Sequence, residues 1–232
     1  MNLRRSANMK SLVLGYCPIG NGASIAPFDM VFKEKKDISS SISGVDAVVF
    51  WGGTDISPSF YNQAPHKYSQ AGNQQVLSYR DSFEYQAMKF CLVNDIPMIG
   101  VCRGAQLLCA FAGGKLIQHC DGHVGRTGHQ IDFIDEDGGV DSVYATSCHH
   151  QMMYPFDVPH EMLAWSSTKQ STFYEDDKGD VDMKGKVEPE IVYFPDVKGL
   201  AIQGHPEWAV GTRFADYCNT LVSRLFFQPV EI

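Results

Sequence analysis

The stretch Ile99–Gln106, which reads Ile-Gly-Val-Cys-Arg-Gly-Ala-Gln, joins an apolar run to a segment rich in helix-forming residues. A glycine lies two residues before Cys102 and another lies two residues after it, which is the pattern of a nucleophile elbow with cysteine in place of serine. Side chains at the flanking positions would not fit so tight a turn, and the helix N-terminus favours the thiolate form of the cysteine. We interpret Cys102 as a nucleophile. The alternative is a buried cysteine in an ordinary strand-to-helix turn.

Apolar runs and helical spacings on both sides of this stretch predict an α/β domain. Residues 47–51 and 97–101 are typical of strands buried on both faces, and residues 80–94 and 104–112 predict helices. Weaker patterns predict strands at 12–17, 130–134, around Val143, at 162–166, 190–194 and 199–203, and a last helix at 212–226. Strands that alternate with helices imply right-handed βαβ units and a mostly parallel sheet.

The composition is that of one globular domain, which we place over residues 1–232. Hydrophobic residues make up 44% and charged residues 20%. The 19 basic and 27 acidic side chains give a net charge of −8, which argues against a nucleic-acid partner. Apolar runs are too short for a signal segment or a membrane helix. Seven cysteines, an odd number and mostly in apolar segments, are typical of reduced thiols, so we expect a cytoplasmic protein.

A thiol nucleophile needs a base, an orienting acid and an oxyanion hole. His205-Pro206-Glu207 follows an apolar strand, and residues two apart in an extended segment face the same way. Glu207 can therefore orient His205 while the other imidazole nitrogen faces Cys102. The N–H of Arg103 and one from Gly52-Gly53 are the expected oxyanion donors. Gly52-Gly53 also fits a simple tight turn.

Two further groups have competing interpretations. The imidazoles of His123, His129, His149 and His150 are common zinc ligands, but their spacings fit no standard site and no cysteines are paired with them. We therefore expect no metal and no cofactor, and predict loop histidines near the cleft that hydrogen-bond carboxylates. The pair Arg80-Asp81 is either a dipole-complementing first turn with a solvated arginine, or a substrate-facing pair. The polar segment Asp55–Tyr79 predicts a loop that covers the cleft.

Three motifs together resemble the class I glutamine amidotransferase superfamily: Gly100–Gln106, His205–Glu207 and Trp51–Pro58. The pattern Gly-Gly-x-Asp-x-x-Pro, followed by Arg80-Asp81, is most similar to the γ-glutamyl hydrolase and γ-glutamyl-γ-aminobutyrate hydrolase branch. The resemblance covers residues 12–226. It implies a three-layer flavodoxin-like fold with a nucleophile elbow and a Cys–His–Glu triad. The triad would be Cys102, His205 and Glu207, with Gly53 and Arg103 as oxyanion donors.

The same resemblance implies substrate-binding residues at Gly52, Gln106, Ser147, Cys148 and His149. Gln106 matches a family glutamine that hydrogen-bonds the glutamyl moiety. Residues 147–149 fall where members hold the substrate's α-carboxylate and α-amino group, often as Asn-Ser-x-His-x-Gln. Gln151 matches that pattern, whereas Thr146 stands in place of the asparagine.

The function implied by the resemblance is hydrolysis of a γ-glutamyl amide through a thioester on Cys102. In one version the substrate is glutamine, and ammonia passes to a separate synthetase. In the other version the chain is a free-standing γ-glutamyl hydrolase that needs no partner. A relative that binds a γ-glutamyl ligand or a partner protein without catalysis is a third hypothesis.

Overall fold

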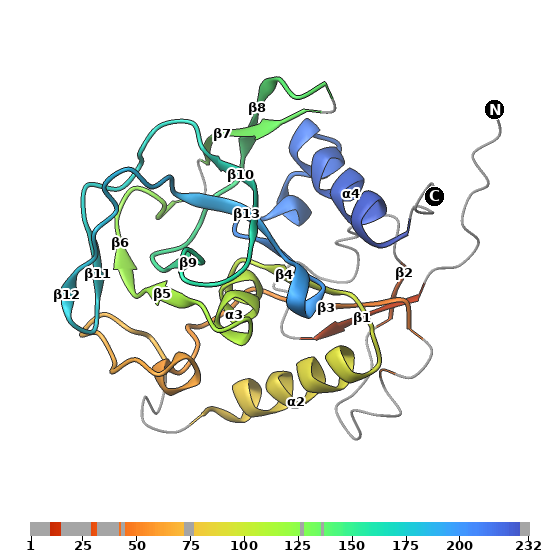
Figure 1. Ribbon diagram of the computed structural model, residues 1–232, viewed down its shortest axis with the longest axis horizontal. Helices are drawn as coiled ribbons and strands as arrows, with labels where there is room; N and C mark the ends of the chain where they lie inside the picture. Colours follow the sequence, from red (N-terminus) through yellow and green to blue (C-terminus); the bar gives the residue numbers. More distant parts are fainter. Residues whose placement is uncertain are drawn as a thin grey trace.

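The computed structural model describes residues 45–71, 77–125, 128–135 and 137–227, together with Ile42 and the backbone of residues 10–14 and 29–31. Within these residues the chain forms a three-layer α/β fold, with a central sheet between helices (Figure 1). The helices are α2 (Tyr79–Val93), α3 (Arg103–Phe111) and α4 (Arg213–Phe226), and short 3-10 helices lie at Pro58–Tyr61, Pro195–Val197 and Pro206–Trp208. The predicted fold class is confirmed.

The central sheet has the strand order β2-β1-β3-β4-β14-β13-β10-β7-β8 among the described residues. Its strands are β1 (Lys10–Leu14), β2 (Asp29–Val31), β3 (Ala47–Phe50), β4 (Met98–Val101), β7 (His129–Ile134), β8 (Val140–Ala145), β10 (Glu161–Ser166), β13 (Pro189–Phe194) and β14 (Gly199–Ile202). Neighbours from β2 to β14 are parallel, and neighbours from β14 to β8 are antiparallel. The parallel part, which the βαβ pattern predicted, carries the candidate site.

Several short strands escaped prediction. They are β2, the pair β5 (Lys115–Ile117) and β9 (Met152–Tyr154), and the group β6 (His119–Cys120), β11 (Tyr174–Asp176) and β12 (Gly179–Asp180). Each has only two or three residues, too few for an alternating pattern to show. The predicted strand at 12–17 begins earlier, as β1, and its residues 15–17 lie outside the described part.

The strands beside the site are buried on both faces. In β3, Ala47 and Val49 join the apolar cluster beneath α4, whereas Val48 and Phe50 join the cluster beneath α2 and α3. Figure 1 shows α4 on the opposite side of the sheet from α2 and α3. Because successive strand residues point to opposite faces, a strand between two helical layers must be apolar throughout, as the sequence is here. Among the described residues, no helix has the length and apolar character that crossing a membrane requires.

The packing of α4 predicts a large difference between two leucines. Leu221 is fully buried against the sheet, whereas Leu92 near the end of α2 is 45% exposed. We expect Leu221→Ala to lower the free energy of unfolding by about 2–5 kcal/mol, because it leaves a cavity in the core. The matched variant Leu92→Ala should cost about 1 kcal/mol or less. Urea denaturation of both variants measures the difference, and equal costs would contradict this placement of α4.

Candidate active site

Cys102 lies at the sharp turn between β4 and α3. Its backbone has φ 54° and ψ −109°, a conformation that a non-glycine residue adopts only at a cost. The flanking glycines are required by space: a Cβ on Gly100 would lie 2.3 Å from the carbonyl oxygen of Gly104, and one on Gly104 would lie 2.0 Å from that of Phe50. The turn therefore has the tight strand-to-helix geometry that the elbow pattern predicted. Helix α3 starts directly after Cys102.

His205 reaches the same edge of the sheet because β14 pairs in parallel with β4, with Ile202 opposite Val101. A Cβ on Gly52 would lie 3.4 Å from Cε1 of His205 and 3.6 Å from Cβ of Cys102, so the two side chains flank this glycine. Nδ1 of His205 lies 2.7 Å from Oε1 of Glu207. The structure thus brings together the cysteine, histidine and glutamate that the sequence singled out.

Two residues that hold His205 were not anticipated in that role. The hydroxyl of Thr146 donates to the carbonyl oxygen of His205 at 2.7 Å and accepts from its N–H at 3.0 Å. The indole ring of Trp208 stacks on the imidazole with centroids 3.7 Å apart and planes 3° from parallel. Thr146 is the residue that replaces the asparagine of the family pattern, and here its hydroxyl fixes the main chain of His205.

The protonation of His205 follows from its neighbours. Burial alone lowers the pKa of an imidazole, but the hydrogen bonds and charges of Cys102 and Glu207 outweigh burial and raise the pKa of His205 to about 10. At neutral pH the imidazole therefore carries a proton beside the sulfur.

A cavity of about 230 Å³ opens beside Cys102. Its described lining residues are Gly53, Asp55, Gln70, Cys102, Arg103, Gln106, Val124, Cys148, His149, His150 and Gln151. Five of the residues predicted for the oxyanion hole or the substrate are thus at the cavity: Gly53, Arg103, Gln106, Cys148 and His149. The carbonyl oxygen of Cys148 lies 3.9 Å from Sγ of Cys102, so the segment that follows β8 forms the wall opposite the nucleophile.

Two predicted substrate residues have other contacts. Ser147 is not among the described lining residues: its buried hydroxyl donates to the carbonyl oxygen of His123 at 3.2 Å. The side-chain amide of Gln106 donates to the carbonyl oxygen of Gln151 at 2.9 Å, which ties the first turn of α3 to the opposite wall. Gly52 lies between the side chains of Cys102 and His205.

A buried ion cluster lies under the elbow. The buried Arg103 side chain binds Asp81 and Glu84 of α2, with 2.5 Å between its Nη1 and Oε2 of Glu84. Glu84 also accepts from Nε of Arg80 at 2.8 Å. Asp81 and Glu84, which bind Arg103, and Arg80, which binds Glu84, all come from α2. These ion pairs connect α2 to the turn at Cys102.

Arg80 connects this cluster to the glycine pair. Its Nη2 donates to the carbonyl oxygens of Trp51 at 2.8 Å and Gly52 at 3.1 Å. A Cβ on Gly53, whose φ is +139°, would lie 2.4 Å from Nη1 of Arg80. The interpretation of Arg80 as a solvated side chain is therefore wrong, because its guanidinium binds Glu84 and two backbone carbonyl groups. Asp81 does complete a capping box with Ser78 at the start of α2, as a first-turn acid can.

The loop that begins at residue 55 is described as far as residue 71, and its residues Asp55 and Gln70 line the cavity. Oδ2 of Asp55 accepts from the N–H of Gln70 at 2.6 Å, and its Oδ1 lies 3.2 Å from Nε2 of His150. The amide of Gln118 donates to the carbonyl oxygen of Ala64 at 2.8 Å. These bonds tie the loop to the cavity wall and to the small β-sheets.

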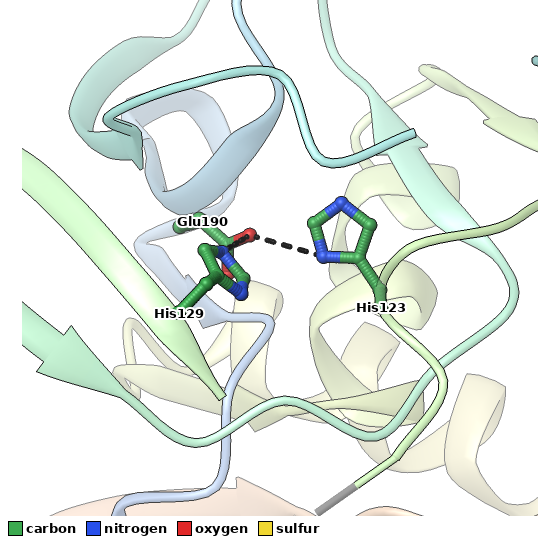
Figure 2. A group of neighbouring side chains, drawn as sticks. All are labelled: His123, His129 and Glu190. Carbon is green, nitrogen blue, oxygen red and sulfur yellow. Dashed lines mark hydrogen bonds and ion pairs between the residues drawn. The ribbon is translucent and has the colours of Figure 1, made fainter. Parts of the chain in front are cut away.

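His123, His129 and Glu190 form a buried cluster (Figure 2), and Glu188 lies beside it. Oε1 of Glu190 is 2.8 Å from Nε2 of His129 and 3.6 Å from Nδ1 of His123. Nε2 of His123 is 3.3 Å from Glu188. As predicted, His123, His129 and His150 approach carboxylates, whereas His149 contacts the carbonyl oxygen of Gln151; His123 and His129 are buried. They do not lie in open loops.

Burial and neighbouring groups shift the pKa values of His129, Glu188 and the adjacent His149. Burial lowers the pKa of His129, but the hydrogen bond and charge of Glu190 outweigh burial and raise it. Burial raises the pKa of Glu188, but contacts with His123 and with backbone N–H groups hold it well below its usual range. Burial, aided by nearby His123, lowers the pKa of His149 well below its usual range, so His149 meets the cavity as a neutral imidazole.

A family model described as Peptidase C26 matches residues 4–167, which include the elbow and the segment after β8. The chain belongs to the peptidase C26 family. The glutamine amidotransferase-like YvdE homolog of Lactococcus lactis subsp. cremoris is 34% identical over 113 residues, 49% of this chain and 56% of that protein. The gamma-glutamyl-CDP-amidate hydrolase of Campylobacter jejuni subsp. jejuni is 34% identical over 92 residues, 40% of this chain and 38% of that protein. The chain thus spans about half of these relatives or less.

Solved structures share the fold of this peptidase C26 chain. A glutamine amidotransferase from Thermotoga maritima aligns with a TM-score of 0.58 at 14% identity, covering 95% of this chain and 99% of that one. The PurLQS structure from Thermotoga maritima aligns with a TM-score of 0.59 at 11% identity, covering 94% and 97%. At such identities the similarity establishes the fold. The resemblance to class I glutamine amidotransferases that the motifs indicated is confirmed.

The contact between His205 and Glu207 predicts how the imidazole titrates. Replacing Glu207 with glutamine removes the carboxylate that stabilises the imidazolium, so Glu207→Gln should lower the pKa of His205 from about 10. Because this pKa exceeds the unfolded value of about 6.5, His205 stabilises the wild-type fold fully below pH 6.5 and loses that contribution between pH 6.5 and 10. NMR titration of labelled histidine measures both midpoints, and an unchanged midpoint in the variant would contradict the pairing.

The ion cluster under the elbow predicts that removing a buried carboxylate lowers the free energy of unfolding far more than removing an exposed one. Glu84→Gln leaves the buried guanidinium of Arg103 with one carboxylate, and we expect a loss of about 3–5 kcal/mol in the free energy of unfolding. The control is Asp157→Asn, which breaks an ion pair with Lys115 whose side chains are 57% and 46% exposed. That variant should lose about 0–1 kcal/mol. Urea denaturation decides, and a small effect of Glu84→Gln would show that the cluster is not needed.

Proposed function

We propose that this peptidase C26 protein cleaves the C–N bond of a γ-glutamyl amide through a covalent intermediate on Cys102. The observation that carries the proposal is the strained turn at Cys102, with protonated His205 beside it and Glu207 bound to the far nitrogen of the imidazole. Backbone strain at one residue is retained where surrounding structure enforces it, most often at a reactive site. A buried cysteine without a chemical role needs neither this turn nor these neighbours.

The first half of the proposed reaction forms a thioester. The Cys102 thiolate attacks the γ-carbonyl carbon, and a C–S bond forms as the carbonyl π electrons move to oxygen. The N–H groups of Gly53 and Arg103, both at the cavity, are the proposed donors to that oxyanion. As the C–N bond breaks, the His205 imidazolium gives its proton to the leaving nitrogen, which departs as ammonia or an amine.

The second half returns the enzyme to its starting state. Neutral His205 takes a proton from water, and the resulting hydroxide attacks the thioester carbon. The C–S bond breaks, glutamate leaves, and Cys102 is again a thiolate beside an imidazolium. Glu207 holds the ring orientation throughout, and Thr146 and Trp208 prevent His205 from moving between the two proton transfers.

The glutamyl group is proposed to bind across the cavity from the nucleophile. Gln106, Cys148 and His149 line this region, and Gly52 and Gly53 leave room for the backbone to approach the substrate. Neutral His149 can donate or accept a hydrogen bond without placing a second cation near His205. Ser147 contributes indirectly, through its bond to the main chain of His123.

Two leaving groups fit this chemistry. The resemblance to the superfamily at large favoured glutamine, with ammonia passing to a separate synthetase, whereas the branch-level motifs favoured the hydrolase; the similarity to glutamine amidotransferase-like relatives supports the glutamine version. Membership of the peptidase C26 family, and the similarity to a gamma-glutamyl-CDP-amidate hydrolase, support a hydrolase that releases a larger amine into water. Water accepts the glutamyl group in both versions, which differ in the leaving group; we favour the hydrolase, because a peptidase family and a gamma-glutamyl-CDP-amidate hydrolase both indicate a leaving group larger than ammonia.

The test measures glutamate release from glutamine and from a panel of γ-glutamyl amines and peptides. We expect turnover of at least one γ-glutamyl amine, little turnover of glutamine, and a loss of at least about 10³-fold in Cys102→Ala, because the nucleophile is removed. Cys91→Ala is the matched control, since Cys91 is a core cysteine on α2, outside the cavity lining. Activity retained in Cys102→Ala would overturn the proposal.

Labelling separates the remaining outcomes. A γ-glutamyl electrophile such as 6-diazo-5-oxo-norleucine should alkylate Cys102 stoichiometrically, as read by peptide mass spectrometry. Selective labelling with turnover of glutamine alone, or without turnover, would indicate the glutamine version with a separate synthetase. Neither labelling nor turnover would indicate a binding protein without catalysis.

A further inference from the structure

We propose that His123, His129 and Glu190 form a binding site for a zinc ion behind the cavity wall. One ligand atom from each of the three residues lies within 4.8 Å of the others. Figure 2 shows both imidazoles directed at the carboxylate of Glu190. Zinc bonds of about 2.0–2.2 Å in a tetrahedral site place ligand atoms about 3.3 Å apart. The observed separations of 2.8 and 3.6 Å from Oε1 of Glu190 lie on either side of that spacing.

The three ligands come from separate elements that the fold holds together. His129 begins β7 and Glu190 lies on β13, and each of these strands pairs with β10. His123 lies in the segment after β6. All three residues are buried, His129 at 7% exposure and the other two at 1%. Spacing along the chain cannot reveal such a site, which is why the sequence predicted none.

A second carboxylate orients His123 from its far side. Oε2 of Glu188 lies 3.3 Å from Nε2 of His123, which leaves Nδ1 facing Glu190. Glu188 is itself fixed, because it accepts hydrogen bonds from the hydroxyl of Tyr174 at 2.6 Å and from the N–H of Ser171 at 2.9 Å. Histidines that bind metals commonly place their other nitrogen against such a carboxylate, which sets the tautomer and the ring direction.

Glu190 has capacity that its protein neighbours do not use. Its Oε1 serves both histidines and also accepts from the hydroxyl of Ser166 at 3.1 Å. Its Oε2 is buried, with no hydrogen-bond partner among the described residues. Within the same part of the chain, no lysine or arginine forms an ion pair with Glu188 or Glu190. A divalent cation would neutralise the two buried carboxylates and take up the free oxygen.

The ligand types favour zinc, and the burial of the three residues favours a structural role for the ion. Two imidazole nitrogens and a carboxylate suit zinc among the available divalent metals. The cavity beside Cys102 is not lined by any of the three ligands, so the proposed ion is closed off from substrate. His123 stacks on His149 with ring centroids 4.5 Å apart, and His149 lines the cavity. The ion would thus hold the wall of the site without taking part in the reaction.

The experiment measures zinc on the full chain and needs no substrate. Protein stripped with a chelator is loaded with Zn²⁺, passed through gel filtration and assayed by metal analysis; Co²⁺ loading reports coordination by visible absorption. We expect one zinc per chain, a Tm several degrees higher with zinc, and the spectrum of a four-coordinate site in which two imidazole nitrogens and both carboxylate oxygens of Glu190 are the donor atoms. Wild-type protein that retains no zinc would overturn the proposal and indicate a histidine–glutamate network bound by hydrogen bonds alone.

Variants locate the ion. Glu190→Gln and His129→Gln should each lose the zinc and the zinc-dependent rise in Tm. His160→Ala, which removes a histidine bound to the carbonyl oxygen of Val158, should keep both. Circular dichroism confirms that each variant is folded, and the wild-type measurements decide alone if one is not. Zinc retained in both ligand variants would place the metal elsewhere and contradict the assignment. Cys102→Ala should bind zinc normally, which separates this site from the proposed reaction.

Discussion

The buried guanidinium of Arg103 is the constraint on which the arrangement of the active site depends. It lies 2% exposed directly after the nucleophile, where its charge must be compensated inside the protein. Asp81 and Glu84 supply that compensation, and their ion pairs hold α2 against the start of α3. The same helix brings Arg80 over the carbonyl oxygens of residues 51 and 52. The same cluster of charges therefore positions both proposed oxyanion donors, Gly53 and Arg103.

The parts of the site that the sequence predicted are those in which neighbouring residues decide the geometry. The elbow at Cys102 is set by its flanking glycines and the start of a helix, and all of these lie within seven residues. His205 and Glu207 are two residues apart, so their contact is also local. The structure adds why His205 lies beside Cys102: β14 pairs in parallel with β4, which brings the carboxyl ends of both strands to one edge.

The parts that escaped prediction depend on contacts between distant segments. Thr146 holds His205 from 59 residues away, and nothing near Thr146 indicates that partner. The cluster of His123, His129 and Glu190 likewise spans three elements, two of them in the antiparallel part of the sheet. Strand order and register determine these meetings, and short strands such as β6 leave too little pattern to predict either. Arg80 was ambiguous for the same reason, because its partners are carbonyl groups that carry no sequence signal.

The positive φ at Cys102 has a consequence for how such a chain evolves. A strained residue of this kind costs about 1–3 kcal/mol, a large share of the 5–15 kcal/mol that typically keeps a domain folded. In the proposed reaction, selection for the sulfur offsets that cost. In a descendant that had lost the need for the reaction, glycine at this position would relieve the strain and be favoured by drift toward stability. If the proposed reaction is correct, a cysteine that persists in this conformation is a record of its continued use.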